Sequence, residues 1–135
     1  MRILLIDDEP LVLSGIRRVL SRQGHEIVVA STGTEALAVL VDDTRFDVIL
    51  SDLMLPDLEG PELYSRAVAR DPELEPRFLF MTGGALTARA RGFVESFKAR
   101  CIDKPFDART VSDRVRDFAA TLPTRRLRPV SVSGG

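Results

Sequence analysis

The chain has 135 residues and a mass of 14.9 kDa, and its 19 basic and 20 acidic side chains leave a formal net charge of −1. This length suits one domain whose core needs no disulfide support. The near-neutral balance excludes a strongly basic nucleic-acid binder, and a single cysteine, Cys101, excludes a disulfide-built secreted module. Because no apolar run reaches the roughly 20 residues of a membrane helix and no signal peptide follows Met1, we expect a cytoplasmic protein without membrane contact.

Five short apolar runs alternate with five segments of helical periodicity. The runs do not alternate apolar with polar residues, which is typical of parallel strands covered on both faces. The expected strands are, in chain order, residues 3–6, 27–30, 48–50, 78–81 and, more weakly, 101–102. The expected helices carry these apolar residues at helical spacing: Val12, Ile16, Val19 and Leu20; Ala36, Leu37, Leu40 and Val41; Leu63, Ala67 and Val68; Ala90, Phe93, Val94 and Phe97; Val111, Val115 and Phe118.

The repeated order of strand and helix predicts an α/β fold with a right-handed, doubly wound parallel sheet. We expect the domain to span residues 1–121, and residues 122–135, which contain Arg, Ser and Gly, to form a flexible tail. The tail holds three arginines and no acid, so the body has 16 basic and 20 acidic residues, a charge of −4. The position of these excess carboxylates therefore becomes the main question.

Polar side chains follow the strands at the edge where open α/β sheets bind ligands, outside the carboxyl ends of the strands. Asp7 and Asp8 follow the first strand and Asp52 the third, while Thr82 and Lys104 follow the fourth and fifth. If the strand order is 2-1-3-4-5, the first and third strands are neighbours, and the acids share one crevice. Two carboxylates about 4 Å apart repel by roughly 4 kcal/mol at an effective dielectric constant of about 20. The cluster therefore needs Lys104 and a hard divalent cation as counter-charges.

The residue types in this cluster favour phosphoryl chemistry. Oxygen ligands without nearby His or Cys favour Mg²⁺ over zinc or copper. A phosphoryl group could then contact the cation, Lys104 and Thr82, and an aspartate can accept it covalently. Taken alone, each motif also fits helix capping or a tight turn. We favour a phosphoryl-accepting aspartate because all the motifs fall at carboxyl ends of strands.

Four motifs resemble the receiver domain of two-component response regulators. They are residues 6–10 (IDDEP), 47–57 (DVILSDLMLPD), 81–83 (MTG) and 103–106 (DKPF), and the resemblance extends over residues 1–121. It implies a flavodoxin-like (βα)5 three-layer sandwich with a five-stranded parallel sheet in the order 2-1-3-4-5.

The resemblance also implies a role for each site residue. Asp52 would accept a phosphoryl group from a partner histidine kinase or histidine phosphotransfer domain, and the domain would later catalyse its own slow dephosphorylation. Such a receiver is not an enzyme with an external substrate. The implied Mg²⁺ ligands are Asp8, Asp52 and the backbone carbonyl of Met54, with Asp7 acting through a metal-bound water. Thr82 and Lys104 would contact the phosphoryl group and move inward when it arrives.

One position departs from the family pattern. Receivers commonly carry Tyr or Phe three residues before the lysine, and this ring couples the site to the surface of the fourth helix, fifth strand and fifth helix. Cys101 stands there in this chain. We expect phosphorylation to survive the change, and output to depend on the loop at Thr82 and on the fourth helix. The resemblance also implies that homodimers could form through this surface of the fourth helix, fifth strand and fifth helix.

A finer resemblance bears on the origin of the chain. Residues 60–64 (GPELY) and 80–85 (FMTGGA) are similar to receivers at the C-terminus of hybrid sensor histidine kinases, and we expect no output domain after the fifth helix. We favour a receiver from a hybrid kinase over a stand-alone single-domain regulator.

Two other function classes fit the sequence less well. A pseudo-receiver that only binds partners is disfavoured because the full set of Asp, Thr and Lys is present. An aspartyl phosphatase needs a second aspartate where Met54 stands, and neither glycine-rich nucleotide-binding motif occurs.

Overall fold

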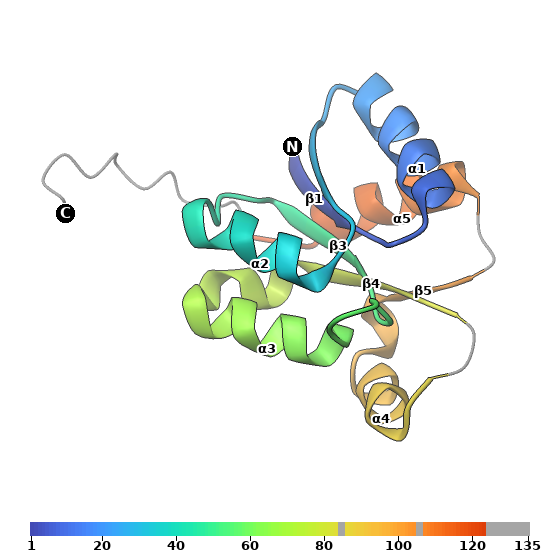
Figure 1. Cartoon of the computed structure of the whole chain (residues 1–135). Coiled ribbons are helices and arrows are strands. Elements are labelled where there is room, and N and C mark those ends of the chain that lie inside the picture. The colour runs from blue at the N-terminus through green and yellow to red at the C-terminus, as the bar shows by residue number, and fades with distance from the viewer. Residues whose placement is uncertain (84–85, 105–106, 124–135) are drawn as a thin grey trace, which may run out of the picture.

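The computed structural model describes residues 1–83, 86–104 and 107–123. Within these ranges, five strands form one parallel sheet in the order β2-β1-β3-β4-β5 (Figure 1). The strands are β1 (Arg2–Ile6), β2 (Glu26–Ala30), β3 (Val48–Asp52), β4 (Phe78–Thr82) and β5 (Cys101–Asp103). The predicted fold class and strand order are therefore confirmed.

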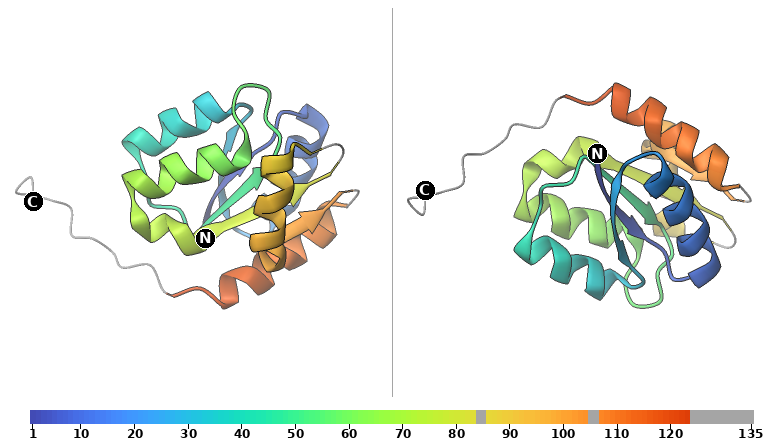
Figure 2. Two further views of the ribbon diagram at one scale, coloured as in Figure 1. Left: turned by 90° about the horizontal axis from the view of Figure 1, so that it is seen from below. Right: turned by 90° about the horizontal axis from the view of Figure 1, so that it is seen from above.

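Helices cover both faces of the sheet, with α1 and α5 on one face and α2, α3 and α4 on the other (Figure 2). Their first turns follow local sequence signals. Pro10 and Pro61 lie in the first turns of α1 and α3, and the side chains of Thr32, Thr87 and Asp107 cap α2, α4 and α5. The helices are α1 (Pro10–Arg22), α2 (Gly33–Asp42), α3 (Gly60–Arg70), α4 (Ala88–Ser96) and α5 (Ala108–Ala120), with short 3₁₀ helices η1 (Pro72–Arg77) and η2 (Lys98–Arg100).

The sheet separates two apolar layers. Successive side chains of a strand point to opposite faces, so Leu4 and Ile6 of β1 pack in the layer of α2 and α3, and Ile3 and Leu5 pack in the layer of α1 and α5. Strands β1, β3 and β4 are buried almost throughout on both faces, which explains why their apolar runs do not alternate with polar residues, whereas the edge strand β2 is partly exposed. Val41 is an exception to the predicted helix faces, because it is 54% exposed. Helix α2 packs against β1, β2 and α3 through its buried residues Ala36 and Leu40, and Val41 lies outside that buried set.

The layer under α4 is rich in aromatic rings. Tyr64 of α3 makes edge contacts with Phe78 and Phe80 of β4 and with Phe93 and Phe97 around α4. These contacts bring α3 and α4 together over the β4 strand, and each ring pair adds about 1 kcal/mol to the burial of its surface. Helix α4 is thus attached to the strand that ends at the candidate site.

The last described residues pack against the body. Leu122 contacts the apolar layer of α1 and α5, and the carbonyl of Pro123 accepts a 2.8 Å hydrogen bond from the buried Arg77. The tail predicted for residues 122–135 otherwise lies outside the described residues. Among the helices that are described, none combines the length and the apolar character needed to cross a membrane.

Candidate active site

Three aspartates meet at the carboxyl end of the sheet, as the sequence predicted. Asp7 follows β1, Asp52 ends β3, and the two strands are adjacent in the sheet. Carboxylate oxygens of Asp7, Asp8 and Asp52 lie within 4.8 Å of one another. Asp7 and Asp52 are buried, whereas Asp8 is exposed. The cluster is thus anchored in the sheet and open to solvent on the side of Asp8.

Backbone N–H groups orient the two buried carboxylates. The N–H of Glu9 donates to Oδ1 of Asp7 at 2.9 Å, and the N–H of Met54 donates to Oδ1 of Asp52 at 3.0 Å. Each contact is made by the residue two positions later, as the chain turns out of its strand. In both aspartates the Oδ2 atom faces Lys104, whose Nζ lies 3.0 Å from Asp52 and 3.4 Å from Asp7.

Lys104 is positioned by the end of β4. Its backbone N–H donates to the carbonyl of Thr82 at 2.7 Å. A Cβ atom at Gly83 would lie 2.7 Å from the Cβ of Lys104, so a residue without a side chain permits this close approach. The ammonium also lies 3.3 Å from Oε1 of Glu9. Burial alone would lower the pKa of Lys104, but its hydrogen bond to Asp52 and the charges of Asp52 and Asp7 outweigh burial and raise it.

Asp7 is fully buried, and its surroundings change its pKa. Its pKa is raised from 3.8 to about 6, mainly because burial disfavours the charged form. The negative charge of Asp52 raises the pKa further, whereas the Glu9 N–H and Lys104 lower it. Burial, together with the charge of Asp52, thus outweighs the two contacts that favour the charged form of Asp7.

A hard divalent cation fits this arrangement. The candidate ligands are oxygen atoms alone, two of them on buried carboxylates, and exposed Asp8 leaves room for water in the coordination sphere. Mg²⁺ keeps several waters and binds through one or two carboxylates, so the donor set suits Mg²⁺ better than zinc, which prefers nitrogen and sulfur ligands.

Thr82 and Met54, the other predicted site residues, lie at the same end of the sheet. Thr82 is the last residue of β4 and is buried, and Met54 is in the loop after β3, where its backbone contacts Asp52. The sequence-predicted residues are thus brought together. Four residues of the sequence motifs, 84–85 and 105–106, lie outside the described residues.

Sequence reasoning missed the contacts that hold the loop after β3. Asp57 accepts hydrogen bonds from the N–H groups of Gly33 (2.8 Å) and Thr34 (2.9 Å) at the start of α2. Glu59 accepts a 2.5 Å hydrogen bond from the hydroxyl of Thr87, the N-cap of α4. The loop that follows Asp52 is therefore tied to two helices. Thr87 could have been predicted as a helix cap, because it is a threonine ahead of a segment with helical apolar spacing. Its hydrogen bond to Glu59, 28 positions earlier in the chain, could not be inferred from the sequence.

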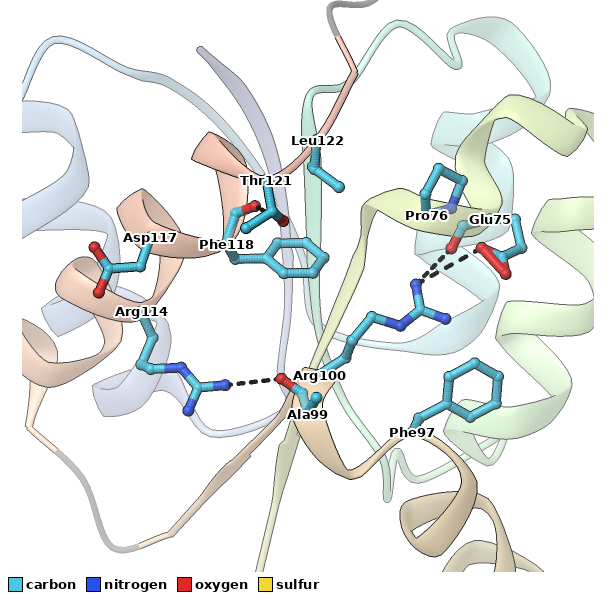
Figure 3. A pocket seen from close by; sticks show the side chains of 10 residues that line it. All are labelled: Glu75, Pro76, Phe97, Ala99, Arg100, Arg114, Asp117, Phe118, Thr121 and Leu122. Atoms are coloured by element: carbon cyan, nitrogen blue, oxygen red, sulfur yellow. Dashed lines mark hydrogen bonds and ion pairs between the residues drawn. The ribbon is translucent and has the colours of Figure 1, made fainter.

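A cavity of about 710 Å³ lies away from this cluster, near the amino-terminal ends of β4 and β5 (Figure 3). Phe97, Phe118 and Leu122 contribute apolar surface to it, and Arg114 donates to the carbonyl of Ala99 beside it. The predicted site residues do not line this cavity, so its size is no guide to the chemistry.

A family model described as the response regulator receiver domain matches residues 3–116. The chain belongs to this family. The sensor kinase CckA of Brucella abortus is 29% identical to this receiver domain, in an alignment that covers 86% of the chain and 12% of CckA. The transcriptional regulatory protein TrcR of Mycobacterium tuberculosis is 32% identical, with 98% of the chain and 60% of TrcR covered. The receiver domain thus spans less than two thirds of either relative.

A solved structure supports the same assignment. The non-phosphorylated HemR receiver domain from Leptospira biflexa superposes with a TM-score of 0.76 at 27% identity, covering 93% of this receiver domain and 98% of that chain. Receiver domains act in two-component signal transduction as signalling modules rather than conventional enzymes. They bind Mg²⁺ in their acidic pocket and interact with histidine kinases or phosphotransfer proteins.

Proposed function

We propose that this receiver domain takes a phosphoryl group from a partner phosphohistidine onto Asp52. One observation carries the proposal: Oδ2 of the buried Asp52 faces the ammonium of Lys104 at 3.0 Å, beside two further aspartates. A carboxylate oxygen of Asp52 attacks the phosphorus, a P–O bond forms, and the P–N bond to the partner imidazole breaks. The electron pair of that bond leaves with the imidazole nitrogen.

The other residues act by position and charge. Lys104 already lies within reach of the Asp52 carboxylate and would pair with a phosphoryl oxygen there. Thr82 ends the neighbouring strand and would donate its hydroxyl to a second oxygen. Such positioning and charge neutralisation account for most of the catalysis in phosphoryl transfer.

Asp8 and Asp52, with the backbone carbonyl of Met54, would hold Mg²⁺, and Asp7 would act through a metal-bound water. The cation supplies charge neutralisation for the phosphoryl oxygens and for the carboxylates that crowd the site. The approach of three carboxylates within 4.8 Å supports this role, because a divalent cation would offset their mutual repulsion.

Intact-mass spectrometry after incubation with Mg²⁺ and acetyl phosphate tests the proposal. We expect one added phosphoryl group that is lost on alkaline treatment, and none in Asp52→Asn. Asp103→Asn is a matched control, because this exposed acid precedes Lys104 in sequence and is not in the aspartate cluster. An unchanged mass for the wild type, or an equal gain in Asp52→Asn, would rule the proposal out.

For output, we propose that α4 reports the state of the site in place of an aromatic ring on β5. Cys101 pairs with Phe80 across β4 and β5, and its thiol donates to the carbonyl of Phe97 at 3.3 Å. The ring of Phe80 contacts Phe93 of α4 at 5.0 Å. Cys101→Tyr should change phosphorylation-dependent partner binding, and unchanged binding in that variant would count against the proposed route.

The partner class is a histidine kinase or a histidine phosphotransfer domain. A sensor kinase and transcriptional regulators both occur among the relatives, at 29% and 32% identity. These identities do not separate a hybrid-kinase receiver from a stand-alone regulator, so the hybrid-kinase origin stays a prediction. Homodimerisation through α4, β5 and α5 and the absence of direct nucleic-acid binding stay predictions as well.

A further inference from the structure

Glu9 makes a contact that the proposed chemistry does not require. It occupies the N-cap position of α1, yet its side chain makes no capping hydrogen bond. The carboxylate instead reaches Lys104, with 3.3 Å between Oε1 and Nζ. Glu9 thus connects the start of α1 to the residue that follows β5.

Glu9 lies on the solvent side of the ammonium. Its side chain is 60% exposed, compared with 8% for Asp52 and 0% for Asp7, the other two acids that contact Lys104. Glu9 is thus the most solvent-exposed of the three acids that contact Lys104, and its negative charge lies beside the ammonium that a phosphodonor needs. The donor must also take Lys104 from Glu9, because the phosphoryl oxygens need the same ammonium.

We propose that Glu9 determines which phosphodonors react with Asp52, by disfavouring donors of high negative charge. This inference rests on the proposed phosphoacceptor role of Asp52. The discrimination follows from Coulomb repulsion between Glu9 and the donor, and from competition between the two for Lys104. A dianionic small molecule meets the full repulsion, whereas a donor with less net charge meets less.

Two small donors differ in charge and deliver the same group. In acetyl phosphate, a dianion, the Asp52 oxygen forms a bond to phosphorus while the P–O bond to the acetyl group breaks and acetate leaves with the electron pair. Phosphoramidate is a zwitterion with a single net negative charge near neutral pH. There the P–N bond breaks, and the nitrogen leaves as ammonia with its three hydrogens.

The test compares phosphorylation rates of the wild type and Glu9→Gln with both donors at saturating Mg²⁺. We expect the substitution to raise the acetyl phosphate rate roughly fivefold and the phosphoramidate rate less than about twofold. The ratio of the two effects measures charge discrimination, which a merely structural role of Glu9 would not change. Added salt shortens the Debye length and should reduce the effect on acetyl phosphate.

Two further variants control the experiment. Glu95→Gln removes the same charge from an exposed position on α4 and should leave both rates unchanged. Glu9→Asp keeps the charge beside the site and should restore most of the wild-type donor preference.

Equal effects of Glu9→Gln on the two donors, or the same donor-dependent effect in Glu95→Gln, would overturn the role of Glu9. If the wild type reacts with neither donor, the proposed function fails as well, and the two failures are therefore distinguishable.

Discussion

The amino-terminal and carboxyl-terminal ends of the parallel sheet both carry charged side chains, and they differ in how those charges are matched. At the amino-terminal end, Arg2 pairs with Glu26 at 2.8 Å and with Asp43 at 2.7 Å, and its N–H donates to Asp47 at 2.8 Å. Arg2 also donates to the carbonyl of Arg45. Each acid that contacts Arg2 thus accepts a hydrogen bond from a separate N–H group of that residue.

The same matching extends along this end to β4 and β5. Buried Arg77 donates to the carbonyls of Asp47 and Pro123. Arg100 donates to the carbonyl of Glu75 at 2.7 Å, lies 3.8 Å from its carboxylate and stacks over Phe97 (Figure 3). Basic side chains at this end donate hydrogen bonds to carbonyl groups and lie close to carboxylates. We expect these contacts to stabilise the folded chain.

At the carboxyl-terminal end, acids outnumber the base that serves them. Asp7, Glu9 and Asp52 all contact the one ammonium of Lys104, with Asp8 close by. The local repulsion costs folding free energy, which a bound cation would recover. The contrast teaches that charged residues stabilise the fold at one end of the sheet and form a binding site at the other. Substitutions at the two ends should therefore change the free energy of unfolding in opposite directions.

The largest effect is expected at the amino-terminal end. Arg77→Ala should lower the free energy of unfolding by about 3 kcal/mol, because it leaves a cavity and removes the donors of two carbonyl groups. Urea unfolding followed by circular dichroism measures this. Arg116→Ala, on the exposed side of α5, should change the same quantity by less than about 0.5 kcal/mol. Equal losses in the two variants would contradict the role of Arg77.

A change of opposite sign is expected in the acidic cluster. Without Mg²⁺, Asp7→Asn should raise the free energy of unfolding by about 2 kcal/mol, because a buried and poorly compensated charge is removed while the Oδ acceptor for the Glu9 N–H remains. The same urea titration detects it, with Asp113→Asn on the surface of α5 as the control. A lower free energy of unfolding in Asp7→Asn would contradict this prediction and would show that the Asp7 carboxylate stabilises the fold.

Added Mg²⁺ should reduce the difference between the two ends. The free energy of unfolding of the wild type should rise with Mg²⁺, by about 1.4 kcal/mol at ten times the dissociation constant. Asp52→Asn should lose this response, and Asp43→Asn at the other end should keep it. Thermal unfolding at a series of Mg²⁺ concentrations measures this response, and an equal response in all three proteins would argue against a specific site.

The smallest effect depends on pH. Burial acts to raise the pKa of Asp43, but hydrogen bonds from the Arg45 backbone and Arg2 and the charge of Arg2 outweigh it and lower the pKa below 3.8. The ionised carboxylate thus contributes stability that is present above pH 3.8 and is lost as pH falls through the lowered value. Asp43→Asn should cost about 1 kcal/mol at pH 7. Urea titrations along a pH series should show this difference vanish in acid, and a difference that persists there would contradict the pairing.

Much of the candidate site could be predicted because it depends on topology rather than on side-chain geometry. Parallel strands end at one edge, so Asp7, Asp52 and Lys104 had to converge once the strand order was 2-1-3-4-5. The contact of Glu9 with Lys104 could not be predicted in the same way. It depends on the rotamer of a long side chain and on the position of an ammonium group that lies 95 residues away in the chain.

The sequence by itself determined the order of strands and helices, the two-sided burial of β1, β3 and β4, and the identity of the acids at the edge of the sheet. These follow from the periodicity of apolar residues and from the alternation of strand faces, which are local properties of the chain. Only the tertiary structure decided that Val41 is exposed, that Arg77 holds Pro123, and that acids are matched with bases at one end and crowded at the other. Those outcomes depend on distances between residues far apart in the chain, which are set when the helices pack against the sheet. The net charge of −1 concealed that uneven distribution.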